Sequence, residues 1–156
     1  MLTLSQYYNH ALLREYMSGV ERDKTRVKAT AEVFTPDELV CEILDKLVET
    51  NPSLFQDISK TFLDPSCGDG QFLAWGLFYK LIAGDLSVLE DNYLWNEYDI
   101  SDVFPEALSA IYGVDLMPDN IKLCHDRLLC GQEHLRSIVE KNIVCHDALT
   151  YDYSFE

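Results

Sequence analysis

The strongest constraint on the fold is a glycine turn between an expected strand and an expected helix. Residues 61–73 read Thr-Phe-Leu-Asp-Pro-Ser-Cys-Gly-Asp-Gly-Gln-Phe-Leu, so a short apolar strand leads to Asp64 and an amphipathic helix follows the turn. Gly68 and Gly70 let the backbone approach a ligand that a Cβ atom would block. The helix begins with free N–H groups and the positive end of its dipole. Because open α/β sheets bind ligands at the carboxyl ends of their strands, this pattern predicts a site for a nucleoside-type cofactor.

The charge of the turn narrows the class of cofactor. No Lys or Arg lies between Lys60 and Lys80, so the turn lacks the Gly-Lys-Ser/Thr ending of a Walker loop. A dinucleotide fingerprint would place its third glycine where this chain has Leu73. Asp64 and Asp69 would repel a pyrophosphate and attract a cofactor that carries an ammonium and a sulfonium. S-adenosylmethionine (SAM) is such a cofactor. The alternative is an ordinary glycine loop that joins a strand to a helix.

Two further apolar segments end in a carboxylate. Residues 110–118 contain an apolar strand that ends at Asp115, and Pro118 is expected to begin another helix. An Asp at this place can accept hydrogen bonds from both ribose hydroxyls, although it can also serve as an ordinary residue at the start of a helix. Residues 142–149 contain a third expected strand, which ends at Asp147. This Asp is placed either to bind an adenine amino group or to occupy a surface turn. Three such strands with helices between them predict a short, mostly parallel sheet.

A fourth segment, Glu32–Leu39, has the pattern of a helix start. Thr35 is expected to be the N-cap, Pro36 fits the first helical position, and Glu38 completes a Thr-x-x-Glu capping box. Apolar residues then recur at helical spacing over residues 39–48. Taken alone, this segment is a well-capped helix with no assigned chemistry.

In their order along the chain, these segments resemble motifs of adenine-N6 DNA methyltransferases of the gamma order. Residues 34–36 are similar to the family's motif X, residues 64–73 to motif I, residues 112–116 to motif II, and residues 146–149 to motif III. The resemblance covers about residues 30–150. It implies an α/β fold of the Rossmann-like SAM-dependent methyltransferase type. The parallel sheet would have strand order 3-2-1, be flanked by helices and be truncated after the third strand.

The resemblance also implies which residues hold SAM. Thr35 would bind the methionine carboxylate, and Asp64 would bind the amino-acid end together with the backbone of Cys67–Gly70. Asp115 would bind the ribose and Asp147 the adenine. The full set that the resemblance places at the cofactor is Phe34, Thr35, Asp64, Cys67, Gly68, Gly70, Asp115, Leu116, Asp147 and Ala148.

The sequence departs from the family at its catalytic motif IV, Asn/Asp-Pro-Pro-Tyr/Phe. No Pro-Pro dipeptide occurs, and Asn51-Pro52-Ser53 lies outside a suitable strand and loop. In the family that loop holds the flipped adenine, so no catalytic residue is assigned. We expect the SAM-binding portion of an adenine-N6 DNA methyltransferase, inactive alone, which reaches DNA only with a partner or a missing domain. The expected partners are a complementing catalytic chain or a second copy. The alternative is a non-catalytic SAM-binding or interaction protein, which sequesters cofactor or acts as an acidic DNA mimic.

Composition predicts one domain over residues 1–156, with an N-terminal helix and polar linker at 1–32 and the methyltransferase-like core at 33–156. A hydrophobic content of 47% supports one sizeable core. The net charge of −15 argues against unaided binding to DNA. Five cysteines without framework spacing favour the cytoplasm. No apolar run reaches the ~20 residues of a membrane span, so no membrane partner is expected.

Three structural expectations complete the prediction. Residues 3–19 should form a helix, and residues 84–109 should add one more helix that packs on the core through Leu89, Tyr93, Leu94, Trp95 and Tyr98. The Cys and His residues at 124–134 lack the paired spacing of zinc ligands, so no metal is assigned. The outer side of the first strand would be left open by a missing fourth strand. We expect a second copy, the helix at 3–19 or the tail at 150–156 to cover it.

Overall fold

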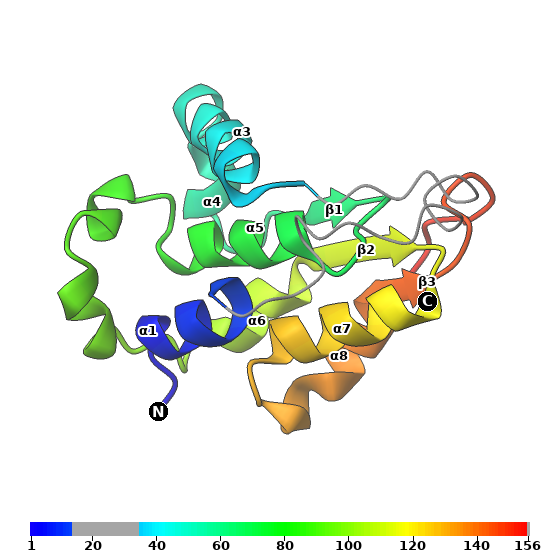
Figure 1. Ribbon diagram of the computed structural model, residues 1–156. Coiled ribbons are helices and arrows are strands. Elements are labelled where there is room, and N and C mark those ends of the chain that lie inside the picture. Colours follow the sequence, from blue (N-terminus) through cyan, green and yellow to red (C-terminus); the bar gives the residue numbers. More distant parts are fainter. Residues whose placement is uncertain (14–34, 156) are drawn as a thin grey trace.

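The computed structural model describes residues 1–13 and 35–155, and it contains one small, open parallel sheet (Figure 1). Its strands are β1 (Phe62–Asp64), β2 (Ile111–Asp115) and β3 (Ile143–Cys145). They pair in the order β1-β2-β3, and both pairings are parallel. The three expected strands and their order are therefore confirmed. β3 is shorter than expected at both ends, because Asn142 still belongs to the preceding helix and the strand ends at Cys145 rather than at Asp147.

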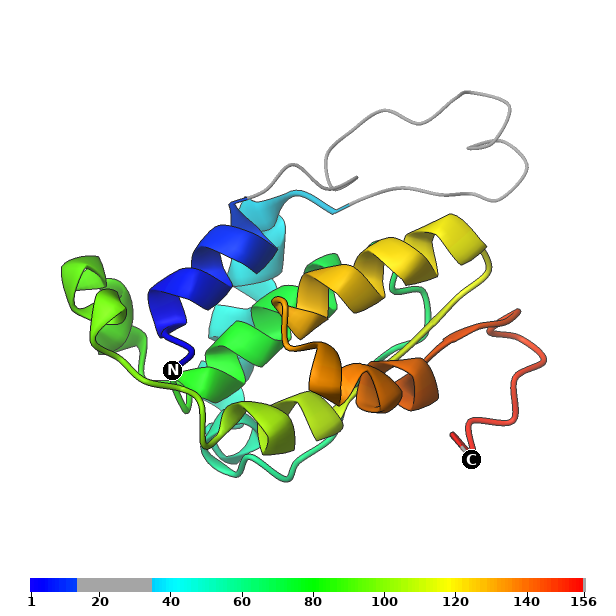
Figure 2. The ribbon, with the colours of Figure 1, turned by 90° about the horizontal axis from the view of Figure 1, so that it is seen from below.

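The crossover helices cover one face of this sheet. They are α5 (Gln71–Leu81), α6 (Phe104–Ser109), α7 (Pro118–Leu129) and α8 (Arg136–Asn142). Figure 2 views the molecule from below, where α5 (green), α7 (yellow) and α8 (orange) lie side by side. Right-handed crossovers that step in one direction across a sheet place all their helices on the same face.

Helix α5 is the centre of the core. Ten of its eleven residues, Leu73 and Phe78 among them, are buried. A Cβ atom on Gly76 would lie 3.2 Å from the Phe62 ring, so this glycine lets α5 approach β1 closely. A Cβ atom on Gly113 of β2 would lie 2.7 Å from Leu73 Cδ1. Phe62 and Gly113 therefore face the helices, and the alternation of a strand turns Leu63 and Tyr112 to the other face.

The N-terminal helix is confirmed only over its first part. It consists of α1 (Leu4–Tyr7), capped by Thr3 and Gln6, and a π-helical turn at Tyr8–Leu12. The remainder of the expected helix and the linker lie outside the described residues. The helix packs beside α5, where the buried Tyr7 hydroxyl donates a hydrogen bond to the Ala74 carbonyl at 2.7 Å.

The expected cap at Thr35 is wrong by one residue. Helix α3 runs over Asp37–Thr50, and Pro36, with ψ at 150°, is its N-cap without a side-chain capping bond. The carboxylate of Asp37 instead accepts hydrogen bonds from the Gln71 and Trp75 side chains of α5. These tertiary contacts fix where the helix begins. A short helix, α4 (Ser53–Gln56), follows α3.

The single helix expected within residues 84–109 is also wrong. The segment forms two 3₁₀ turns, η2 (Leu86–Leu89) and η3 (Asn92–Asn96), followed by α6. Asp85 accepts a hydrogen bond from the Ser87 backbone, and such local bonds compete with a continuous helix. Of the aromatic residues expected to pack on the core, Trp95 is buried, whereas Tyr93 and Tyr98 are exposed.

We expected a second copy, the N-terminal helix or the tail to cover the outer side of β1. Among the described residues, no strand pairs with this side of β1. The described part of the N-terminal helix packs beside α5 and η3 rather than along β1, and residues 14–19 of the expected helix lie outside the described residues. The tail crosses the face of the sheet opposite the crossover helices, which we call the second face; here the Phe155 and Tyr112 ring centroids are 4.8 Å apart.

Among the described residues, no helix is both long and apolar enough to cross a membrane.

Candidate cofactor site

The aspartates at the strand ends are staggered in steps of two residues. Asp64 lies opposite Gly113 in the register of the sheet, and Asp115 lies opposite Cys145. With neighbouring strands about 4.8 Å apart and a rise of about 3.3 Å per residue, the Cα atoms of Asp64 and Asp115 are roughly 8 Å apart. Asp147 comes two residues after Cys145. The sheet thus brings all three aspartates to its carboxyl edge, as its parallel order requires.

Asp115 is the centre of the hydrogen bonding at this edge. One carboxylate oxygen accepts the Gly68 N–H at 3.1 Å, and the other accepts the Met117 N–H and the Asn120 side-chain amide, each at 3.0 Å. These bonds tie the glycine turn after β1 to the end of β2. Because a carboxylate offers about four acceptor positions, a ribose diol can take both of its bonds only if one of these donors gives way. The Gly68 N–H is the donor that belongs to the turn.

The glycine turn has the backbone conformation that its sequence predicts. Gly68 and Gly70 have φ values of 55° and 94°, in the region that disfavours side chains. Gly70 also packs against α7, because a Cβ atom there would lie 2.7 Å from Cys124 Sγ. The Cys67 N–H donates to the Val114 carbonyl at 2.9 Å, which fixes the turn against β2.

Asp69 does not face the cofactor side, contrary to the argument that its charge attracts SAM. Its side chain is completely buried and lies 3.4 Å from the guanidinium of Arg127 on α7. The attraction for a cation must therefore come from Asp64 and Asp115. The reason is long-range packing, since the partner of Asp69 lies 58 positions farther along the chain.

Asp64 is half-buried and accepts the Ser66 N–H at 3.0 Å. Burial raises the pKa of Asp64, and the nearby charge of Asp115 adds to this effect. Burial and a neighbouring carboxylate both disfavour the ionised form of a carboxyl group, and a cationic partner stabilises that form. The charge pattern of the edge therefore still suits a cationic ligand, with two carboxylates rather than three.

The Cys67 thiol belongs to the interior. Its hydrogen bond with the Cys124 thiol and its burial raise the pKa of Cys67 well above the usual value. A thiol in this state is a poor nucleophile. Of Cys67, therefore, the backbone rather than the sulfur is available to contact a ligand at this site.

The third strand end is more open. Asp147 is exposed, and its carboxylate accepts the Leu149 N–H at 2.9 Å within a surface turn. Ala148 is partly buried, and its carbonyl accepts the Tyr153 hydroxyl. Leu116, directly after Asp115, is 55% exposed at the carboxyl edge of the sheet. An exposed apolar side chain beside Asp115 suits contact with a flat ring.

The segment similar to motif X lies close to the turn. Asp37 contacts Gln71, the first residue of α5, and Thr35 is only two residues earlier in the chain. Two residues span at most about 7 Å, so Thr35 lies near the beginning of α5. Phe34 lies outside the described residues.

The residues of α7 that hold the site residues in place were not predicted from the sequence. Arg127 donates to the Gln71 side chain at 2.6 Å as well as pairing with Asp69, and Asn120 holds Asp115. One signal was available for Arg127. It follows Ile121 and Cys124 at helical spacing, and a charge on an apolar helix face needs a buried partner.

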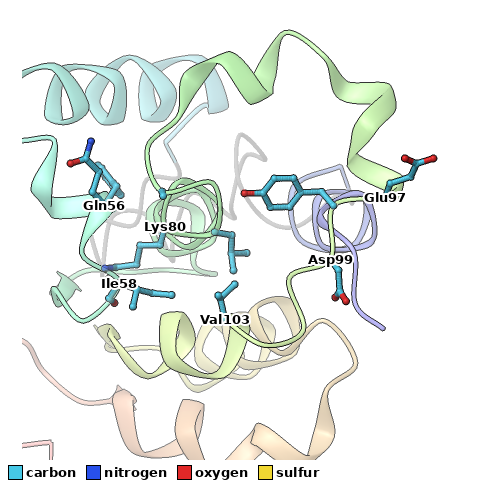
Figure 3. A pocket seen from close by; sticks show the side chains of 10 residues that line it. Gln56, Ile58, Lys80, Glu97, Asp99 and Val103 are labelled. Atoms are coloured by element: carbon cyan, nitrogen blue, oxygen red, sulfur yellow. Dashed lines mark hydrogen bonds between the residues drawn. The ribbon is translucent and has the colours of Figure 1, made fainter.

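Two cavities lie elsewhere in the molecule. The larger, about 560 Å³, is lined by Phe55, Lys80, Tyr98 and Val103 among others. Figure 3 shows Lys80 beside Ile58, with Glu97 and Asp99 across the cavity. The Lys80 ammonium donates to the Ile58 and Lys60 carbonyls, and burial lowers the pKa of Lys80. The smaller cavity, about 370 Å³, lies on the second face of the sheet between Leu63 and Phe155. Neither of these two is lined by the aspartates of the carboxyl edge.

No group of three or more His, Cys, Asp or Glu side chains is placed to hold a metal ion in residues 1–13 and 35–155. No protein-family model matches the chain, and no curated protein matches it.

Proposed function

We propose that this chain is the SAM-binding portion of an adenine-N6 DNA methyltransferase with a Rossmann-like fold. The observation that carries the proposal is the hydrogen bond from Gly68 N–H to Asp115, which joins the glycine turn to the carboxylate of the next strand. A cofactor with a ribose and a cationic amino-acid end needs these two features side by side. The motifs quoted above supply the chemical class, and the sheet order supports their arrangement.

The chain's own residues would act as binding and orienting groups. Asp115 would accept the ribose hydroxyls after the Gly68 N–H gives way, and Asp64 would face the ammonium. Asp147 would accept the adenine amino group, and Thr35 would donate to the methionine carboxylate. When bound, SAM supplies an activated methyl group. In this proposal the protein contributes only position and charge, which are the main protein contributions to a direct displacement.

A calorimetric titration tests the proposal. We expect the purified chain to bind SAM, and its demethylated product in the same site. The product lacks the sulfonium charge, so it should bind more weakly if the charges of Asp64 and Asp115 contribute. Absence of heat with both ligands would contradict the proposal for this chain.

We further propose that methyl transfer requires a second chain or segment that carries an Asn-Pro-Pro-Tyr type loop. The purified chain alone should transfer no labelled methyl from SAM to adenine-containing DNA, because it contains no Pro-Pro dipeptide and has a net charge of −15. Labelled DNA from the chain alone would contradict this prediction. Activity that appears only with a complementing chain would favour a split enzyme over a protein that sequesters cofactor or mimics DNA.

A further inference from the structure

A buried polar network lies behind the glycine turn. Arg127 is 2% exposed and directs its guanidinium at three different segments. Its Nη1 lies 3.4 Å from the Asp69 carboxylate, its Nη2 donates to Gln71 Oε1 at 2.6 Å, and its Nε donates to the Ala11 carbonyl at 2.6 Å. One side chain of α7 thus holds the turn, the beginning of α5 and the N-terminal helix.

The network grips the turn on both sides of Gly70. Asp69 comes directly before this glycine and Gln71 directly after it. The other end of Gln71 donates to Asp37 at the beginning of α3. Glycines have the widest backbone freedom, so a turn with two of them needs outside contacts to keep one shape. Two of the residues that Arg127 contacts, Asp69 and Gln71, flank Gly70 and are placed to impose this shape.

The composition of the network favours a positioning role over simple packing. A buried ion pair is often no more stabilising than an apolar pair of similar volume. What an arginine adds is a rigid planar fork whose donors have fixed directions. Here those donors reach Asp69 and Gln71, the two residues that flank Gly70.

We propose that Arg127 is a positioning residue for the glycine turn. By holding Asp69 and Gln71, it fixes the shape of the turn, whose Gly68 N–H reaches Asp115 in the free protein, and so keeps the two halves of the cofactor site in register when that N–H gives way to a ligand. The part of this inference that concerns ligand affinity rests on the function proposed above. The part that concerns the shape of the turn does not, because the free protein already shows the contacts.

Selective labelling gives a direct readout of the turn. The chain has seven glycines, so a protein labelled with ¹⁵N only at glycine gives few signals. The amides of Gly68 and Gly70 are bonded to Asp115 and to the Cys67 carbonyl, and that of Gly84 to the Tyr79 carbonyl. Hydrogen exchange at Gly68 and Gly70 therefore reports on the turn. Gly84, in a turn after α5, is an internal control.

The decisive variant is the double substitution Asp69→Asn with Arg127→Met, which removes both charges and leaves neither buried alone. Exchange at Gly68 and Gly70 should become about tenfold faster or more, as expected for the loss of directing charged hydrogen bonds, while Gly84 stays as in the parent protein. Arg127→Lys keeps the charge without the fork and should show the same selective effect. Arg127→Lys replaces the double variant in this test if the double variant does not fold.

Two exchange results would overturn the proposal. One is parent-like exchange at Gly68 and Gly70 in either folded variant. The other is an equal acceleration at Gly84, which would mean that Arg127 only stabilises the fold. In the calorimeter, SAM affinity should fall about tenfold or more in the same variants. Unchanged affinity would refute the link to the ligand. A parent chain that does not bind SAM would refute the proposed function, and the exchange result would still decide the role of Arg127.

Discussion

Asp64, Asp69 and Asp115 are close in space but have different partners. Asp69 is paired with Arg127, and Asp115 is occupied by three N–H donors. Only Asp64 is left half-buried with a single local hydrogen bond and with its pKa raised by burial. The sequence predicted that Asp64 and Asp115 meet, because parallel strands bring their carboxyl ends together. It did not predict that Asp69 turns inward, because nothing local in the turn indicates Arg127.

The raised pKa of Asp64 predicts how one substitution depends on pH. Because the folded state binds this proton more tightly than the unfolded state, ionised Asp64 destabilises the fold, and the effect grows as pH rises from the ordinary Asp pKa through the folded value. Asp64→Asn should therefore raise the urea midpoint near pH 7 relative to the parent. The gain should shrink toward about pH 4, near the ordinary value.

Asp57→Asn is the matched control for this experiment. Hydrogen bonds from Ser59 lower the pKa of Asp57, so ionised Asp57 favours the folded state. Its substitution should lower the midpoint near neutral pH, opposite in sign to Asp64→Asn. A loss of stability for Asp64→Asn at neutral pH would contradict the assigned environment of Asp64.

Helices and strands were predictable where local pattern and packing agree. Pro118 does begin α7, and the three short strands lie where apolar runs meet Asp or a turn. The expected element boundaries were wrong where contacts outside the local pattern determine them. The beginning of α3 is set by the bonds of Asp37 to α5. The segment between Gly84 and α6 is broken by local side-chain bonds such as that of Asp85.

Close approach of the turn to α7 makes Gly70 sensitive to a single methyl group. Gly70→Ala would place a side chain at φ 94° and a Cβ atom 2.7 Å from Cys124 Sγ. We expect a loss of about 2–4 kcal/mol, which combines left-handed strain with overpacking. Gly131 also has a positive φ, but among the described residues, its two chain neighbours apart, no atom lies within 4 Å of its added Cβ. Gly131→Ala should lose only about 1–2 kcal/mol in urea denaturation. Equal losses would show that the contact with Cys124 does not constrain the turn.

The molecule as a whole has helices on one face of its sheet and an aromatic tail on the other. The tail contacts Tyr112 through Phe155, yet Leu63 remains 45% exposed and the outer side of β1 has no strand beside it in the described residues. This arrangement was only partly predictable. The sequence indicated an open strand, but the choice of the second face by the tail depends on aromatic contacts between distant residues.

The outer side of β1, unpaired in the part of the chain that the structure describes, lies beside an apolar face, and this arrangement predicts association between chains. We expect light scattering at micromolar concentration to detect a dimer. Phe155→Ala should increase association because it uncovers Tyr112, and Leu63→Lys should reduce it because a charge guards the strand. A strict monomer for the parent and for Phe155→Ala would contradict this prediction.

Calorimetry of one matched pair of variants tests the proposal that Asp115 and the glycine turn form a SAM site. Asp115→Ala removes the proposed ribose acceptor, and Asp91→Ala removes an exposed carboxylate far from the turn in sequence, with the same change in net charge. We expect Asp115→Ala to weaken SAM binding by about 1.5–3 kcal/mol, more than tenfold, and Asp91→Ala to bind SAM like the parent. SAM binding by Asp115→Ala that equals that of the parent would contradict the account.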